Sequence, residues 1–307
     1  MVSTSRFQQL FDRKDAGLLM IAHRGDCSRA PENTLLAADW GKRSGAVAWE
    51  LDVHLTKDGV PVVIHDESLA RTTNVATKFA GDRRGIQGYL VADFDLIEIE
   101  SLDAGGWFLQ PEPTERTARA LGTTDLIDPT TRNAICNGSV TIPTLEQALI
   151  WTKDHNWLVN VELKSFPHLD ARLTEVVLKT IRETQSENHV LVSSFDHREI
   201  CRVVDTAPEI PVGALCATPI GRSAVYAGEI LNVNALHVSA DVLGASSLAY
   251  QRCRQASSLA VAEIHALRAN GIAVLVYTVN DPKLARDLFD AGVTGVFSDT
   301  PGTIQAG

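Results

Sequence analysis

The stretch 46-AVAWELDVHLTKDGVPVVIHDES-68 holds two apolar, strand-forming runs joined by the turn residues Asp58 and Gly59. This pattern predicts a strand followed by its hairpin return. Charge is rare inside buried strands, yet Glu50 and Asp52 lie in the first run and His65 ends the second. Side chains two residues apart on a strand point to the same side, so we expect Glu50 and Asp52 to face the same way.

Two further apolar runs carry charge in the same manner. The segment 18-LLMIAHRGD-26 ends in His23 and Arg24, and 157-WLVNVELKS-165 contains Glu162 and Lys164. A carboxylate that is buried alone is strongly unfavourable or takes up a proton. Three such runs in one chain therefore indicate a shared site rather than three unrelated exceptions.

Short apolar, β-branched runs recur along the chain and alternate with segments of helical character. Most of the runs are too short for helices and lack clean alternation, which is typical of parallel strands buried on both faces. Asn33 is expected to cap the first helix of this alternation, and Pro143 with Thr144 to start a later one. Eight runs predict an α/β fold, a single (β/α)₈ TIM barrel over 1–307: 18–22, 46–53, 157–163, 189–195, 211–217, 235–240, 273–279 and 295–299.

Residues 67–141 interrupt the alternation after the second strand. They lack strong periodicity and are rich in Thr, Gly, Asp and Pro, as in 110-QPEPTERTARALGTTDLIDPTTRNAICNGS-139. A connection this long inside a compact domain is usually functional or a small subdomain. Because it follows a barrel strand, we expect it at the C-terminal face, where active sites form. We therefore predict that 67–141 is an insertion that acts as a lid or substrate wall.

The composition is that of an ordinary globular protein and narrows the set of partners. The 307 residues carry a formal net charge of −10, and the sequence pI is about 5.4. Nucleic acids and anionic membranes attract basic patches, so neither nucleic acid nor stable membrane association is expected. Five cysteines without CxxC spacing and a polar N-terminus predict reduced thiols and a cytoplasmic location. The sequence is compatible with a homo-oligomer and does not define one.

Three acids, Glu50, Asp52 and Glu162, are expected to converge at the ends of adjacent strands. A divalent cation removes the cost of burying three carboxylates together, and an all-oxygen ligand set favours a hard ion over zinc. The alternative is that each acid forms its own salt bridge at a strand end, which is less plausible for three acids at this spacing. The sequence thus predicts one bound Mg²⁺ or Ca²⁺ ion, with Mn²⁺ also compatible.

Two histidines and two cations accompany the acids. His23 and His65 follow runs that end at the same face of the predicted barrel, and imidazoles serve as base and acid near neutral pH. Arg24 and Lys164 add positive charge, which suits a phosphate group. The combination predicts phosphate-ester chemistry on a small-molecule phosphodiester. The other histidines are expected to be structural, and His237 is the least secure of them because it lies on the sixth predicted strand. They are His54, His155, His168, His189, His197, His237 and His265.

Eight blocks of the sequence resemble, in order, the signature blocks of glycerophosphodiester phosphodiesterases. They span about residues 18–301, and the first two together are highly specific for this family. The family's barrel fold agrees with the strand count. Its small insertion after the second strand corresponds to part of 67–141. The blocks are 23-HRGDCSRAPENT-34, 50-ELDVHLTKDGVPVVIHD-66, 102-LDAGGWF-108, 142-IPTLEQAL-149, 161-VELK-164, 193-SSFD-196, 277-YTVND-281 and 295-GVFSDTP-301.

The resemblance implies a mechanism and a role for each matching position. One histidine would deprotonate the glycerol hydroxyl beside the phosphodiester, and that oxygen would attack phosphorus. The other would protonate the leaving alcohol, after which water opens a cyclic phosphate. The matching positions are the metal ligands Glu50, Asp52 and Glu162, the acid–base pair His23 and His65, and the phosphate contacts Arg24 and Lys164.

The chain departs from the family pattern between Phe108 and Ile142, where a long excursion replaces a short connection. This segment is expected to shape the side of the site that receives the alcohol. Trp107, Phe108 and Tyr277 could form an apolar substrate-binding wall there. As single aromatic residues they are equally well explained as core.

The leading hypothesis is a phosphoric diester hydrolase of lipid metabolism that splits glycerophosphodiesters into an alcohol and glycerol 3-phosphate. Within this class, sugar phosphodiesters such as the agrocinopine-like opines are an alternative substrate. A lysophospholipase D-like activity is disfavoured because no membrane-binding helix accompanies the site. From a different class, a barrel could bind phosphodiesters without hydrolysing them, but the complete set of histidines and acids disfavours that alternative.

Overall fold

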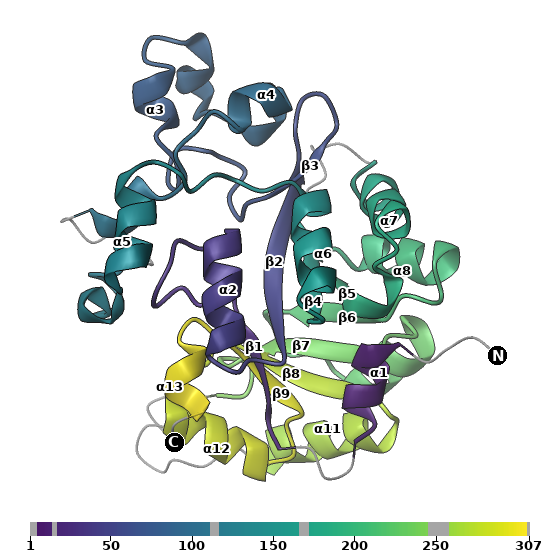
Figure 1. The fold of residues 1–307 in the computed structure, drawn as a ribbon. Helices are drawn as coiled ribbons and strands as arrows, with labels where there is room; N and C mark the ends of the chain where they lie inside the picture. Colours follow the sequence, from purple (N-terminus) through teal and green to yellow (C-terminus); the bar gives the residue numbers. More distant parts are fainter. Residues whose placement is uncertain (1–4, 14–16, 111–116, 166–171, 245–257, 306–307) are drawn as a thin grey trace.

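The computed structural model describes residues 5–13, 17–110, 117–165, 172–244 and 258–305. His168, Cys253 and residues 111–116 of the predicted lid lie outside the described residues. Eight parallel strands close into a barrel, because β1 pairs with both β2 and β9, and helices surround it (Figure 1). This confirms the predicted TIM barrel. Its strands are β1 (Leu19–Ala22), β2 (Ala48–Leu55), β4 (Val159–Leu163), β5 (Val190–Ser194), β6 (Val212–Cys216), β7 (Ala235–Ser239), β8 (Ala273–Tyr277) and β9 (Gly295–Ser298).

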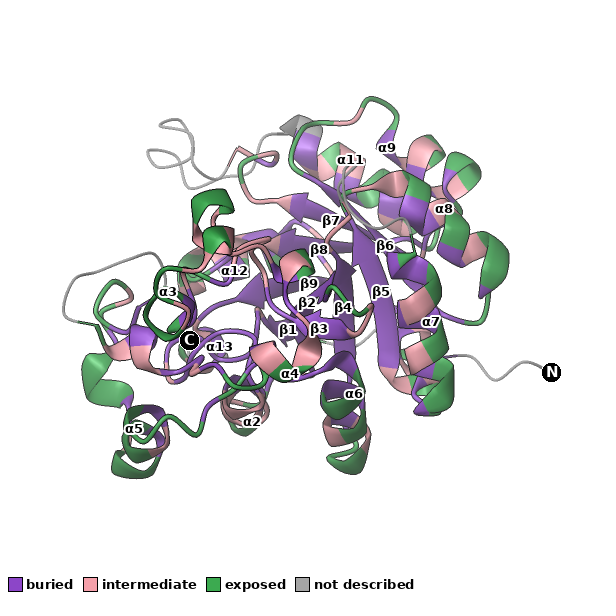
Figure 2. Cartoon of the chain, turned by 90° about the horizontal axis from the view of Figure 1, so that it is seen from above, coloured by how far each residue is buried: buried purple, intermediate pink, exposed green. Residues whose placement is uncertain are grey.

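Alternation along the strands divides their side chains between two cores. On β2, Trp49 and Leu51 belong to the large core between barrel and helices, whereas Ala48 belongs to the core inside the barrel. On β4, Val161 faces the helices and Leu158, just before the strand, faces the interior. Because successive side chains of a strand point to opposite faces, the charged positions of both strands belong to the inward set. In Figure 2 the barrel strands are buried, and exposed residues lie on the outer faces of the helices.

Several helices begin at a polar residue that caps their first turn. The sequence predicted such caps at Thr144 and at Asn33, and the structure has the first but not the second. The Thr144 side chain accepts a hydrogen bond from the backbone N–H of Gln147 at 3.2 Å. Thr34, not Asn33, caps α2 (Leu35–Arg43), so that prediction is wrong. No described helix is long and apolar enough to cross a bilayer. The other barrel helices are α6 (Leu145–Asp154), α7 (Leu173–Glu183), α8 (His197–Thr206), α9 (Ser223–Val225) with η6 (Tyr226–Ile230), α11 (Ser258–Ala269), α12 (Pro282–Asp290) and α13 (Pro301–Gln305).

The N-terminal helix α1 (Arg6–Phe11) closes one end of the barrel. Phe7 and Phe11 are buried in the same interior core as Leu19, Ala235 and Ala273, which are the first residues of their strands. The N-terminal ends of the strands are therefore filled with apolar side chains. A site inside the barrel opens at the C-terminal ends.

The strand β2 continues beyond the barrel rim and carries the insertion. Its last residues pair antiparallel with β3 (Pro61–Val63), which confirms the predicted hairpin. The insertion has two small cores of its own, one around Leu69 and Phe94 and one around Phe108 and Ile135. In Figure 1, α4 lies beside the tip of the hairpin, α3 lies farther from the hairpin, and α5 lies beside α2. Its elements are α3 (Val75–Lys78), η1 (Arg83–Gln87), η2 (Val91–Asp93), α4 (Leu96–Ile99), η3 (Gly106–Leu109), η4 (Thr124–Leu126) and α5 (Pro129–Cys136).

Candidate active site

The register between β2 and β4 places the three predicted acids side by side. Asp52 pairs with Glu162, and Glu50 pairs with Asn160, at the C-terminal part of the barrel interior. One carboxylate oxygen from each of Glu50, Asp52 and Glu162 lies within 4.8 Å of the others. All three side chains are buried, with exposed fractions of 2%, 1% and 6%. The structure therefore brings together the acids that lie 110 residues apart along the chain at positions 52 and 162.

The electrostatics of the cluster favour a bound cation. Burial, together with the charges of Asp52 and Glu162, raises the pKa of Glu50 well above its ordinary value. Within the described chain, Glu50 Oε1 is buried without a hydrogen-bond partner. An oxygen-only set of carboxylates with an unpartnered buried oxygen suits Mg²⁺ or Ca²⁺. The residues present thus fit a hard divalent ion.

Two cations already lie against the acids. Lys164 Nζ is 2.9 Å from Asp52 Oδ1 and also contacts Glu162 Oε1, and Arg24 Nε is 3.3 Å from Asp52 Oδ2. Burial alone would raise the pKa of Asp52, but Lys164 and Arg24 outweigh it and hold that pKa well below its usual range. Asn33 donates from Nδ2 to Asp52 Oδ2 at 2.8 Å, which fixes the carboxylate.

A second layer of charge holds Arg24 in place. Its backbone has a positive φ of 57°, and its N–H donates to Glu50 Oε2 at 2.9 Å. The guanidinium donates to Glu32 Oε1 at 2.9 Å, and Arg71 donates to the same oxygen at 2.8 Å. Glu32 therefore holds Arg24 against the acids and binds Arg71 of the insertion at the same time. The φ of Arg24 belongs to the left-handed region, where a non-glycine residue is uncommon.

His23 is held by a carboxylate from the opposite end of the chain. Its Nδ1 lies 2.9 Å from Asp299 Oδ1, and its Nε2 lies 3.9 Å from Glu50 Oε2. Asn280 donates from Nδ2 to Asp299 Oδ2 at 2.8 Å, which fixes that carboxylate in turn. A carboxylate at Nδ1 orients an imidazole and stabilises its protonated form. The ring is thereby set with Nε2 toward the acid cluster.

His65 has an equivalent partner in its own neighbour. Its Nδ1 lies 2.7 Å from Asp66 Oδ1, and Arg71 Nε donates to Asp66 Oδ2 at 2.6 Å. Burial would raise the pKa of Asp66, but its bonds to His65 and Arg71 lower that pKa far below its usual range. Asp66 is thus a carboxylate across the physiological pH range. The two histidines share one design, an imidazole with a fixed carboxylate at Nδ1.

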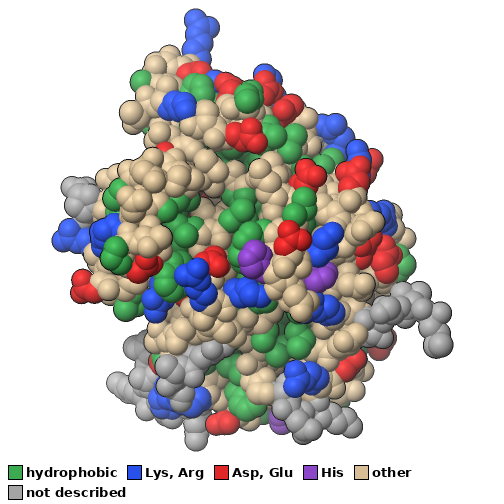
Figure 3. Space-filling view, viewed as in Figure 1, with side chains coloured by type: hydrophobic (Ala, Val, Ile, Leu, Met, Phe, Trp, Pro, Cys, Tyr) green, Lys and Arg blue, Asp and Glu red, His purple; other side chains and the backbone are tan. Residues whose placement is uncertain are grey.

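One pocket of about 190 Å³ joins these groups at the mouth of the barrel. It is lined by both histidines, both cations, Glu50 and Glu162, and by a set of neutral residues from other strands. Figure 3 shows acidic and basic side chains interspersed over the face drawn, without a large area of one charge. The neutral lining residues are Asn160, Phe195, Leu215, His237, Tyr277, Thr278 and Phe297.

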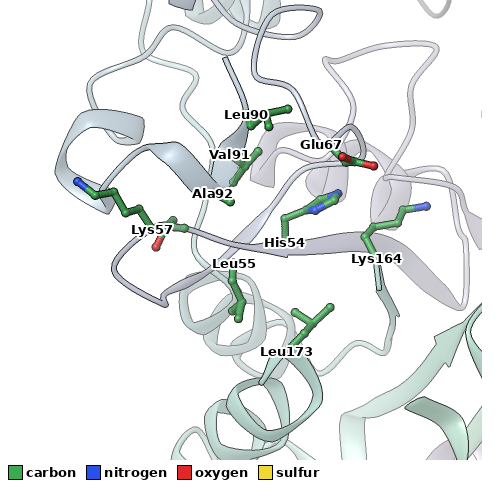
Figure 4. Close-up of a pocket in the computed structure, with 10 residues that line it drawn as sticks. His54, Leu55, Lys57, Glu67, Leu90, Val91, Ala92, Lys164 and Leu173 are labelled. Carbon is green, nitrogen blue, oxygen red and sulfur yellow. The ribbon is translucent and has the colours of Figure 1, made fainter. Parts of the chain in front are cut away.

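A neighbouring pocket of about 200 Å³ shares Lys164 with the first. Figure 4 shows the side chains of His54 and Lys164 projecting from their strands toward Glu67, while Leu55 projects to the other side. Its wall includes residues 90–92, which belong to the insertion. The insertion therefore reaches a cavity beside the acid cluster through its first half.

The three aromatic candidates separate. Tyr277 lines the pocket, donates its hydroxyl to the carbonyl oxygen of Cys216 at 3.0 Å and packs edge-on against Phe195. Trp107 and Phe108 are buried in the second core of the insertion and are not among the residues that line the pocket. That core packs against Leu36 of α2, outside the barrel. The structure thus unites Tyr277 with the acids. Trp107 meets the site through Arg71, whose guanidinium carbon lies 5.9 Å from the centre of the indole ring, and Phe108 does not line the pocket.

Three further residues of the site were not assigned from sequence. Asp299 and Asp66 orient the histidines, and Asn33 fixes Asp52. The dipeptide His65-Asp66 was a signal, because adjacent side chains at a turn can bond each other. Asp299 lies 276 positions from His23, and only the closure of β9 onto β1 brings them together.

Residues 23–303 match the Glycerophosphoryl diester phosphodiesterase family. The chain belongs to this family. It is 31% identical over 286 residues to a glycerophosphodiester phosphodiesterase of Caldanaerobacter subterraneus, covering 93% of this chain and 96% of the relative. A glycerophosphodiester phosphodiesterase of Bacillus altitudinis is 30% identical over 283 residues, covering 92% and 94%.

Solved structures of this phosphodiesterase family have the same fold. An Oleispira antarctica phosphodiesterase in complex with the product sn-glycerol-3-phosphate superimposes with a TM-score of 0.70 at 27% identity, covering 94% of this chain and 96% of that one. A putative glycerophosphoryl diester phosphodiesterase from Silicibacter pomeroyi gives a TM-score of 0.75 at 25% identity, covering 97% and 95%. The protein is a phosphoric diester hydrolase, and its buried acids form a site that could hold a metal ion.

Proposed function

We propose that the chain is a metal-dependent enzyme that hydrolyses glycerophosphodiesters to an alcohol and glycerol 3-phosphate, with His23 and His65 as the acid–base pair. One observation carries the proposal. Two imidazoles, each with a carboxylate at Nδ1, line the same pocket as the acid cluster. The product complex of the Oleispira antarctica relative supports glycerol 3-phosphate as the common product.

Glu50, Asp52 and Glu162 would hold the ion. When bound, a divalent cation offsets their charge, polarises a phosphoryl oxygen and lowers the pKa of a nearby hydroxyl. Arg24 and Lys164 face the same pocket and stabilise the negative charge that develops on the phosphoryl oxygens in the transition state. Glu32 and Asp52 keep both cations oriented before substrate arrives.

The histidines move the protons in two steps. One imidazole takes the proton of the hydroxyl beside the phosphodiester, and that oxygen forms a bond to phosphorus. The bond from phosphorus to the alcohol oxygen breaks, and the other imidazole, protonated, gives its proton to that oxygen. Water then opens the cyclic phosphate to glycerol 3-phosphate with the proton roles reversed. Asp299 and Asp66 stabilise whichever imidazole carries the extra proton.

The leaving alcohol would extend toward the insertion. The pocket that shares Lys164 with the site is walled by Leu90, Val91 and Ala92 and offers a cavity beside the groups that would hold the phosphate. This arrangement supports a role for the first half of 67–141 in choosing the alcohol.

A panel of diesters tests the proposal. Glycerophosphocholine, glycerophosphoethanolamine, a sugar phosphodiester and a lysophospholipid are each incubated with Mg²⁺, Ca²⁺ or Mn²⁺, and products are identified by ³¹P NMR. We expect glycerol 3-phosphate and free choline from glycerophosphocholine. Release of phosphocholine instead, or equal turnover in excess chelator, would overturn the proposal.

A further inference from the structure

His237 lies inside the barrel without a role in the chemistry above. It follows Ala235 by two positions on β7, and Ala235 belongs to the interior core, so the imidazole also faces the interior. The residue is fully buried, and its ring packs at 5.1 Å from the ring of Phe297. It nevertheless lines the same pocket as the catalytic groups. His237 thus forms part of the floor of the active-site pocket.

Three polar atoms of this floor have no hydrogen-bond partner among the described residues. Both ring nitrogens of His237 and Oδ1 of Asn160 are buried without a hydrogen bond in the described chain. Asn160 uses its Nδ2 to donate to Ser193 Oγ at 3.0 Å, which leaves its oxygen as an acceptor. Buried polar groups are almost always paired with protein or with a bound molecule. Three unpartnered atoms on two residues that line one pocket therefore point to a ligand.

A glycine on the neighbouring strand leaves room for this imidazole. Gly213 on β6 faces the same interior, and a Cβ added to it would lie 2.3 Å from His237 Nε2. Any other residue at 213 would collide with the ring. Glycine within a strand removes packing area, so its presence here is accounted for by the close approach of His237.

The floor suits a neutral group. Burial lowers the pKa of His237 to about 3, so the ring is uncharged and offers one N–H donor and one nitrogen acceptor. Asn160 adds an acceptor oxygen. Phosphate would find no positive charge here, whereas Arg24 and Lys164 offer it at the rim. A hydroxyl both donates and accepts and matches these groups.

We propose that His237 and Asn160 form a hydroxyl-binding floor and that His237 is a specificity-determining residue for the polyol half of the substrate. It binds the terminal glycerol hydroxyl, which takes no part in the reaction. Asn160 pairs with Glu50 in the register of β2 and β4 and precedes Glu162 by two residues, a rise of about 6.6 Å. The floor therefore begins level with Glu50 and lies one inward position below Asp52 and Glu162. This inference rests on the proposed function, because it names how that substrate is recognised.

The test compares two diesters that differ in one hydroxyl. Glycerophosphocholine and its 2-hydroxypropyl analogue both keep the hydroxyl beside the phosphodiester, and only the first has the terminal one. We expect the wild-type enzyme in Mg²⁺ to prefer glycerophosphocholine by about 10²-fold or more in kcat/KM, since a site built for a hydroxyl rejects the analogue that lacks it. His237→Leu should remove most of that preference by slowing glycerophosphocholine, while turnover of the analogue stays within about threefold. His237→Gln should restore part of it.

The control is Leu275→Val, which alters packing beside His237 on β8 without a polar change. It should affect both diesters equally. Equal loss of both substrates in His237→Leu would show a packing role only, and equal turnover of both by the wild type would show that the floor holds water. Either outcome overturns the inference.

Binding separates this inference from the proposed reaction. If the wild type hydrolyses neither diester, calorimetric titration with glycerol 3-phosphate and with 2-hydroxypropyl phosphate decides the floor alone. Tighter binding of glycerol 3-phosphate that is lost in His237→Leu supports it. Equal affinity for the two phosphates in the wild type contradicts it.

Discussion

The active-site pocket has two halves with different chemistry. The charged half comes from the ends of β1, β2 and β4 and comprises His23, Arg24, Glu50, Asp52, Glu162 and Lys164. The neutral half comes from β5 to β8 and comprises Phe195, Leu215, His237 and Tyr277. Both halves use the same inward positions of a single barrel. This difference supports the proposal that reaction takes place on the charged side, whereas His237 of the neutral half, with Asn160 of β4, recognises the uncharged polyol.

The strongest way to break this comparison is to remove charge from the first half. Glu162→Gln keeps the shape of the side chain but removes one ligand of the ion, so we expect kcat/KM to fall by roughly 10³-fold or more. Circular dichroism should show an unchanged fold. The matched control is Asp154→Asn, an exposed acid at the end of α6, which should leave activity unaltered. Substantial activity in Glu162→Gln would mean that the acids are only structural.

The carboxylates behind the histidines offer a finer test of the charged half. Asp299→Asn leaves His23 in place but removes the group that stabilises its protonated form, so we expect kcat to fall by about 10–10²-fold with KM little changed. Because the imidazolium is no longer favoured, the limb of the pH–rate profile that reports His23 should move to lower pH. His23→Ala gives the lower limit of activity. An Asp299→Asn enzyme with a wild-type profile would exclude a positioning role for Asp299.

The neutral half makes a prediction about stability. Folded His237 has a pKa of about 3 against an ordinary value of 6.5, because its ring is buried. Between these values the unfolded chain takes up a proton that the folded chain does not, so stability present above pH 6.5 is lost as pH falls. At pH 5 the loss is about 2 kcal/mol. Urea unfolding at pH 7.5 and 5.0 should show a smaller loss in His237→Leu than in wild type. Equal losses would contradict a buried neutral ring.

The smallest effect concerns the second half of the insertion. The sequence favoured a substrate wall at 110–139, and its described residues pack against α2 through the core around Phe108 and Ile135. The Trp40 indole also donates to Thr131 Oγ1 of α5 at 2.9 Å. We therefore expect a short linker in place of 110–139 to lower the melting temperature and to change the preference between alcohols by less than about threefold. A larger change in the preference between alcohols would show that 110–139 contacts the substrate.

The barrel could be predicted from the sequence because each strand is a short apolar run that can be recognised without knowledge of the rest of the fold. Glu50, Asp52 and Glu162 could be placed together because period-two alternation and parallel order act over short ranges. The pairing of His23 with Asp299 depends on how β9 closes the barrel, which no local pattern reveals. Asn33 and Thr34 are adjacent and both residue types cap helices, so the sequence alone did not show which of them caps α2. In the structure Thr34 is the cap, and Asn33 donates a hydrogen bond to Asp52.

The aromatic residues and His237 illustrate a second limit. Trp107 and Phe108 lie in a motif that matches the family, yet their environment is a core formed by residues up to Val140. His237 resembles a structural histidine by type. Its unpartnered nitrogens and the space left by Gly213 emerge only from the packed interior. The burial and hydrogen bonding of a single side chain depend on contacts with residues far away in the sequence, and local patterns do not reveal those contacts.

The central claim is that the charged half holds one divalent ion and needs it for hydrolysis. Mn²⁺ titration of the metal-free enzyme, followed by calorimetry and by hydrolysis of glycerophosphocholine in the same samples, tests it most directly. We predict one tight site per chain, activity that rises in proportion to its occupancy, and loss of both in Glu162→Gln. Full activity before any Mn²⁺ is bound, or unchanged Mn²⁺ binding in Glu162→Gln, would contradict the claim.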